Sequence, residues 1–178
     1  MFMPKPRFAN LLATITLSSG VALAQSPDLG MRIAPADIAA WDNAVLSDGT
    51  GLPPGSGTAA EGAPIYAQKC ALCHGVNLEG GISLALVGGE PLTNGIDTLK
   101  TIKNFWPVAT TLFDYTRRAM PWLQPRTLTD DEVYALTAYL LAVNDIINED
   151  QEMNAETLAK VQMPNRDGFI VRFPDHTP

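Results

Sequence analysis

The clearest hydrophobic pattern lies in the second half of the chain. Val133, Leu136 and Leu140 recur at three- and four-residue spacing, which is typical of a helix with one apolar face. Thr129 precedes them and Glu132 follows it by three positions, which is the signature of a capping box. The pattern therefore predicts a helix that begins after Thr129 and ends near position 143.

Weaker helical patterns occur on both sides of this segment, and no alternating pattern of strand type is evident. Glycine pairs between positions 75 and 97 indicate a long loop. The chain is therefore predicted to be all-α. The further helices are expected at residues 35–41, 59–72, 98–104, 110–118 and 154–161.

The first 24 residues have the pattern of an export signal. Lys5 and Arg7 precede an apolar stretch, and Ala22 and Ala24 satisfy the small-x-small rule for cleavage after Ala24. The alternative is an uncleaved membrane anchor. The apolar stretch is short and rich in serine, which favours cleavage and a chain that is not integral to the membrane afterwards.

The segment that follows, residues 25–58, contains a turn-rich run of glycine and proline at positions 48–57. It is either a linker or an arm that packs over a domain. Trp41 and Leu52 are large apolar residues that a free linker does not need. We therefore expect an N-terminal arm that packs on the domain through both of them.

The charge balance is acidic. The formal net charge is −7, and loss of residues 1–24 removes two of the 12 basic residues and none of the 19 acidic ones, which makes it −9. Nucleic acid is therefore excluded as a partner, because it requires a basic surface. The charge suits a protein partner with a basic patch, and it equally suits simple solubility.

Candidate chemistry is concentrated at Cys70, Cys73 and His74. These residues form the C-x-x-C-H pattern of covalent haem attachment. Two thioether bonds must reach two vinyl groups on one edge of the porphyrin, and one turn of helix separates the cysteines by roughly 5 Å. His74 follows at once and can bind the iron. The motif predicts one covalent haem c.

Two other interpretations of the cysteines are weaker. A disulfide is the usual state of a cysteine pair in an exported protein, and a redox-active C-x-x-C normally opens a helix instead of ending one. A structural zinc site needs four ligands. The second histidine, His176, lies near the end of the chain, far from the motif in sequence.

Haem iron in electron carriers commonly takes methionine as its second axial ligand. Met120 precedes Pro121 in the connection before the capped helix, where a loop can fold back over the haem. We expect Met120 to be this ligand. Met163, which also precedes a proline, and His176 remain alternatives.

Three further residues are expected near the haem. Arg117 and Arg118 can donate charge-assisted hydrogen bonds to propionates, or they can simply be solvated at the end of a helix. Trp106 is expected either to pack against the ring edge or to donate its N–H group.

The order of these motifs resembles the class I cytochrome c fold. Gly62 and Tyr66 precede the C-x-x-C-H motif, and Met120 and Tyr139 follow it. The resemblance implies a small helical bundle around one haem, in which Gly62 and Tyr66 meet Tyr139 where the first and last helices cross. The cytochrome domain is expected at residues 59–145, with a C-terminal extension at 146–178.

Longer segments resemble the cytochrome subunits of bacterial sulfite and sulfane dehydrogenases. These segments are residues 41–57, 105–121 and 163–169. The single C-x-x-C-H motif matches the single-haem form. The resemblance implies a periplasmic cytochrome that accepts electrons from a molybdenum-containing sulfite dehydrogenase-type subunit and passes them to a downstream cytochrome or oxidase.

Two other functions remain open at this stage. In one, a catalytic or displaceable sixth ligand site acts on a small sulfur compound or peroxide. In the other, the sixth ligand leaves to admit a diatomic gas. The carrier interpretation is preferred because His74 and Met120 would fill both axial positions, which leaves no substrate site on the iron.

Overall fold

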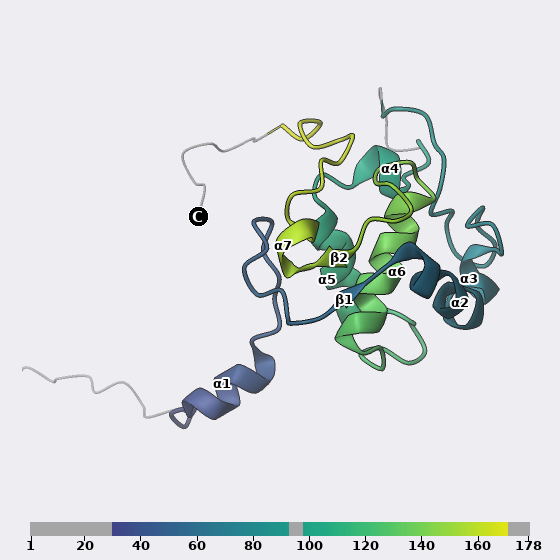
Figure 1. Cartoon of the computed structure of the whole chain (residues 1–178). Coiled ribbons are helices and arrows are strands. Elements are labelled where there is room, and N and C mark those ends of the chain that lie inside the picture. The colour runs from purple at the N-terminus through teal and green to yellow at the C-terminus, as the bar shows by residue number, and fades with distance from the viewer. Residues whose placement is uncertain (1–29, 93–97, 171–178) are drawn as a thin grey trace, which may run out of the picture.

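The computed structural model describes residues 30–92 and 98–170 and is mostly helical. Figure 1 shows most of its elements gathered around α6. The helices are α1 (Pro35–Trp41), α2 (Ala59–Lys69), α3 (Ala71–His74), α4 (Ile102–Phe105), α5 (Ala109–Ala119), α6 (Asp130–Ala142) and α7 (Ala155–Leu158), and the strands are β1 (Ser56–Gly57) and β2 (Met153–Asn154).

The predicted capped helix is confirmed as α6. The Thr129 side chain accepts a hydrogen bond from the Glu132 amide, and the Glu132 carboxylate accepts one from the Thr129 amide at 2.8 Å. Helix α2 begins with a second capping box, formed by Thr58 and Glu61. Both boxes satisfy amide groups that the first turn of a helix leaves without partners.

Helices α2 and α6 cross at Gly62, as the resemblance implied. A Cβ atom at Gly62 would lie 2.0 Å from the carbonyl oxygen of Ala135, so only glycine allows this approach. One turn further along, the rings of Tyr66 and Tyr139 pack with their centroids 5.4 Å apart. The crossing fixes α2, and with it the haem attachment motif, on the core.

The core of the bundle lies between α5, α6 and the segment after α6. Phe113 and Tyr134 are fully buried, with ring centroids 4.5 Å apart. The last segment contributes Met153, Leu158 and Met163 to the same core. The C-terminal extension is therefore packed into the domain as far as Met163.

A two-residue antiparallel ladder joins the two ends of this domain. Ser56 pairs with Asn154 and Gly57 pairs with Met153. A Cβ atom at Gly57 would lie 2.4 Å from the Ala135 amide nitrogen, so this strand also passes close to α6. Strands of two residues are too short to produce an alternating sequence pattern, which is why they were not predicted.

The N-terminal arm is packed on the domain over only part of its length. Leu52 packs against the core as predicted, and the Tyr134 hydroxyl donates to the carbonyl oxygen of Pro53 at 2.8 Å. The expectation for Trp41 is wrong, because its side chain is 80% exposed. In Figure 1, α1 stands apart from the other helices.

None of the helices in residues 30–92 and 98–170 has the length and hydropathy that a membrane span requires. The predicted export signal and its cleavage after Ala24 lie outside the described residues.

Candidate haem site

The C-x-x-C-H motif forms a tight turn at the end of α2. Cys70 ends α2, and α3 then carries Cys73 and His74. The amides of Cys73 and His74 both donate to the carbonyl oxygen of Cys70 at 3.1 Å. No disulfide joins the two cysteines, and both are half-buried. The turn therefore presents two thiols from one short helical segment, as attachment to one porphyrin edge requires.

Two neighbours hold the end of this turn. The Tyr66 hydroxyl donates to the carbonyl oxygen of Gly75 at 2.7 Å. Burial raises the pKa of Tyr66 to about 12, so the hydroxyl keeps its proton at neutral pH. Gly75 has a φ of +83°, and a Cβ atom there would lie 2.6 Å from the carbonyl oxygen of Gly80. Glycine at this position allows the chain to reverse directly after His74.

A backbone carbonyl orients the imidazole of His74. Its Nδ1 atom lies 2.9 Å from the carbonyl oxygen of Leu84. A carbonyl oxygen only accepts hydrogen bonds, so Nδ1 carries the proton and Nε2 keeps its lone pair. A hydrogen bond of this kind fixes the tautomer and the ring orientation of a metal-binding histidine. His74 is therefore prepared to bind iron through Nε2.

The environment of Cys70 argues against thiol redox chemistry. Burial raises the pKa of this thiol to about 11. Redox-active C-x-x-C motifs need the opposite shift, because the thiolate is the nucleophile. A thioether has no proton to lose, so the same half-buried position suits a covalent haem.

Met120 lies where α5 ends. Its amide donates to the Thr116 carbonyl oxygen at 3.1 Å, and its backbone is extended, with φ of −115° and ψ of 150°. The side chain is half-buried, whereas Met163 is only 3% exposed and lies within the hydrophobic core. Met163 thus has a packing role already, which leaves Met120 as the better candidate for the iron. His176 lies outside the described residues.

Two ion pairs involve the last turn of α5, the helix that leads to Met120. Arg117 donates from Nε to Asp130 Oδ1 at 2.8 Å, and Arg118 pairs with Asp114 one turn earlier. The expected role of these arginines at the propionates stays a prediction. Trp106 is half-buried, and its ring lies 5.9 Å from that of Tyr115.

The residues present fit a covalent haem. Beside the two thiols and the oriented imidazole, several large apolar side chains are exposed close in sequence to the predicted ligands. Leu72 lies between the cysteines and is 85% exposed, and Trp122 and Leu123 follow Met120 and are 81% and 91% exposed. Such side chains are suited to contact an apolar macrocycle.

Sequence reasoning missed the groups that position the ligands. The Leu84 carbonyl and the Gly75 carbonyl are backbone atoms, which any residue supplies, so the sequence contains no signal for them. The ion pair of Asp114 with Arg118 could have been predicted, because Asp114 precedes Arg118 by four positions on a predicted helix.

Comparison with known proteins agrees with this site. A family model described as cytochrome c oxidase, cbb3-type, subunit III matches residues 57–140. A chain in the crystal structure of the sulfane dehydrogenase SoxCD from Paracoccus pantotrophus is 39% identical, with a TM-score of 0.76 over 85% of this chain and 75% of that one. The chain belongs to the c-type cytochrome family of the sulfane dehydrogenase haem subunit. No curated protein sequence matches this cytochrome.

The family confirms the class I cytochrome c fold and implies haem c as the cofactor. The cytochrome is accordingly an electron-transfer subunit similar to that of SoxCD. Its family match begins at the strand that precedes α2 and ends within α6, the two helices that cross at Gly62.

Proposed function

We propose that this cytochrome carries single electrons from a molybdenum sulfite or sulfane dehydrogenase subunit to a downstream cytochrome or oxidase. The supporting observation is the 39% identity over 85% of the chain to a sulfane dehydrogenase chain, together with the C-x-x-C-H turn. One haem c is attached, because Cys70 and Cys73 are the two cysteines of the sequence.

The haem supplies one-electron redox chemistry at its iron. Cys70 and Cys73 would hold it through thioether bonds, and His74, whose Nδ1 atom lies 2.9 Å from the Leu84 carbonyl oxygen, would bind the metal through Nε2. Met120 would supply a second iron ligand, and its position after the end of α5 supports this assignment. A thioether ligand raises the reduction potential relative to a second histidine, which suits an acceptor of electrons.

The carrier acts in the periplasm. Residues 1–24 direct export and are removed after Ala24, which leaves an arm at 25–58, a cytochrome domain at 59–145 and an extension at 146–178. Covalent attachment of haem c is consistent with a periplasmic location. An acidic chain that carries an export signal is consistent with it as well. The net charge of −9 favours encounter with a basic patch on the partner.

Reduction by the dehydrogenase tests this function. The purified ferric cytochrome is mixed with the molybdenum subunit and either sulfite or a sulfane substrate, and the α band of the reduced haem is followed by stopped flow. The proposal predicts substrate-dependent reduction with one electron taken up per chain. A cytochrome that ascorbate reduces and the dehydrogenase with its substrate does not would overturn the proposal.

A further inference from the structure

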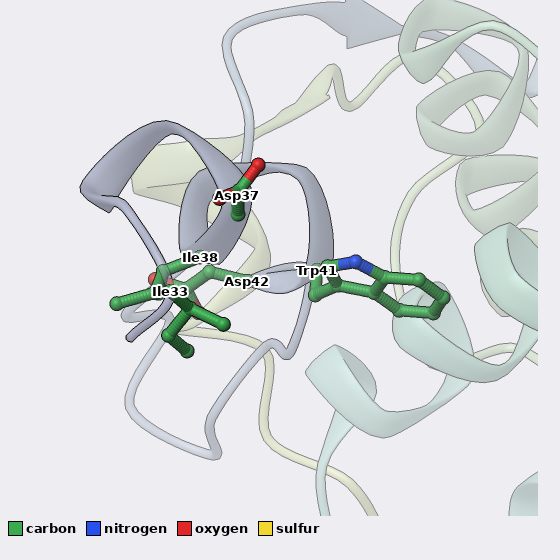
Figure 2. Close-up of a pocket in the computed structure, with 5 residues that line it drawn as sticks. All are labelled: Ile33, Asp37, Ile38, Trp41 and Asp42. Carbon is green, nitrogen blue, oxygen red and sulfur yellow. The ribbon is translucent and has the colours of Figure 1, made fainter. Parts of the chain in front are cut away.

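The N-terminal helix α1 exposes an apolar surface that the domain does not cover. Ile33, Ile38 and Trp41 are 68%, 48% and 80% exposed. Together with Asp37 and Asp42 they line a hollow of about 480 Å³. Figure 2 shows Ile33, which precedes α1, close to Ile38 of the helix, with Trp41 extending from the end of the helix.

This surface is not part of the contact between the arm and the domain. The hydrogen bonds of residues 34–43 connect them only to one another in the part of the chain that the structure describes. The arm reaches the domain from Asn43 onward, where it lines a pocket with Arg117 and Arg118, and Val45 then packs on the core. Figure 1 shows α1 away from the bundle.

A helix of seven residues is too short to be stable in water by its own hydrogen bonds. Exposed isoleucine and tryptophan side chains on such a helix favour a partner that buries them. An amphipathic helix commonly binds by laying its apolar side chains in a groove of another protein.

The comparison with SoxCD indicates which partner this is. The alignment covers 85% of the chain, a share that the segment from residue 57 to the end cannot supply. The shared region therefore extends into the arm, although the cytochrome family model begins only at residue 57. Helix α1 lies in a region that is shared with a subunit of a dehydrogenase complex and makes no hydrogen bond to the described residues of its own domain, so it is suited to hold that complex together.

We propose that α1 docks the cytochrome onto the molybdenum dehydrogenase subunit, an inference that rests on the proposed function. Ile33, Ile38 and Trp41 enter an apolar groove on that subunit. Asp37 and Asp42 line the same hollow, and no ion pair joins either carboxylate to another described residue. Basic side chains along the edge of the groove would complement these two carboxylates. The arm tethers the haem domain, and the haem edge remains free for electron transfer.

A pair of variants tests the docking. Ile38→Ser combined with Trp41→Ser removes the apolar contact, and Leu46→Ser is the control, because Leu46 is 54% exposed in the part of the arm next to the domain. Affinity for the purified molybdenum subunit is measured by surface plasmon resonance on intact haem-loaded cytochrome. The double variant is expected to bind at least about tenfold more weakly, with the control unchanged.

The reduction assay separates this inference from the proposed function. If the wild type is not reduced by the dehydrogenase, the proposed function fails. If the wild type is reduced and the double variant binds with equal affinity, the docking role of α1 is wrong. Sedimentation of the cytochrome without the partner is the last measurement. If the wild type is a dimer and the double variant is a monomer, the surface binds a second copy of the chain and the inference is wrong. Unchanged absorption and circular dichroism spectra confirm that the variant is folded.

Discussion

Arg117 donates from Nε to Asp130 Oδ1 across 2.8 Å, and this ion pair joins the last turn of α5 to the first residue of α6. The chain between them carries Met120. The guanidinium and the carboxylate are about one-quarter and one-third exposed, so water screens their attraction in part. The pair joins the two ends of the loop that contains Met120, the methionine we propose as an iron ligand.

Arg117→Gln is expected to loosen this loop. In wild-type ferric protein, the weak far-red band of sulfur-ligated haem should persist on heating until the loop opens. The variant should lose the band roughly 2–4 °C earlier, which corresponds to a loss of about 1 kcal/mol. Arg126→Gln is the control, because Arg126 is exposed in the same loop without an ion pair among the described residues. If Arg117→Gln and Arg126→Gln lose the far-red band at the same temperature, Arg117 has no specific role in holding the loop.

The crossing of α2 and α6 is sensitive to a single methyl group. Gly62→Ala would place Cβ 2.0 Å from the Ala135 carbonyl oxygen, so the helices must separate. We expect a loss of stability of about 3 kcal/mol or more, or no folded protein. Ala67→Leu adds more bulk at an exposed position of the same helix and should change stability by less than about 0.5 kcal/mol. Chemical denaturation measures both, and a stable Gly62→Ala variant would show that the crossing tolerates side chains.

Tyr66→Phe removes the hydroxyl that holds the Gly75 carbonyl. The expected loss in free energy of unfolding is about 1 kcal/mol, the usual net value of such a hydrogen bond. Since the pKa of Tyr66 is about 12, the loss should be constant from neutral pH to about pH 10. Tyr115→Phe is the matched control, since Tyr115 is 48% exposed. Equal losses in both variants would show that the hydroxyl of Tyr66 makes no specific contribution.

The ion pair of Lys69 and Glu132 makes stability depend on pH. Their side chains meet at 2.7 Å and link α2 to α6. The hydrogen bond from Lys69, helped by the Thr129 amide, holds the pKa of Glu132 below its ordinary value of 4.5. A carboxyl group whose pKa is lowered by folding stabilises the native state above its unfolded pKa, and this contribution is lost as the pH falls through the folded pKa.

Glu132→Gln tests that dependence by denaturation at several pH values. The difference from wild type should be about 1 kcal/mol at pH 7 and should shrink below about pH 4.5. Glu149→Gln, at an exposed position, should show no such change. A difference that stays constant down to about pH 3 would mean that the carboxylate charge is not responsible.

The sequence was informative where a structure depends on local spacing. Helix α6 follows from one apolar periodicity and one capping box, and the C-x-x-C-H turn follows from the reach of two thioethers. The Tyr66–Tyr139 contact came from resemblance to a family. In each case the residues that matter are few and their types are restrictive.

The features that the sequence did not predict depend on contacts between segments that are distant in the chain. Met153, Leu158 and Met163 complete the core from short segments in which no periodicity develops. The Leu84 carbonyl orients His74, yet a backbone oxygen has no sequence signature. Trp41 was expected on the domain because it is large and apolar, but those properties indicate burial without indicating against which partner.

The central claim is that His74 and Met120 occupy both axial positions of the haem iron. The chain would then act as an electron carrier. The ferric absorption spectrum of three proteins tests it most directly. Wild type and Met163→Leu should be low-spin and retain the far-red sulfur-to-iron band, whereas Met120→Ala should lose it. A high-spin wild-type spectrum, or a Met120→Ala variant that keeps the band while Met163→Leu loses it, would contradict the account.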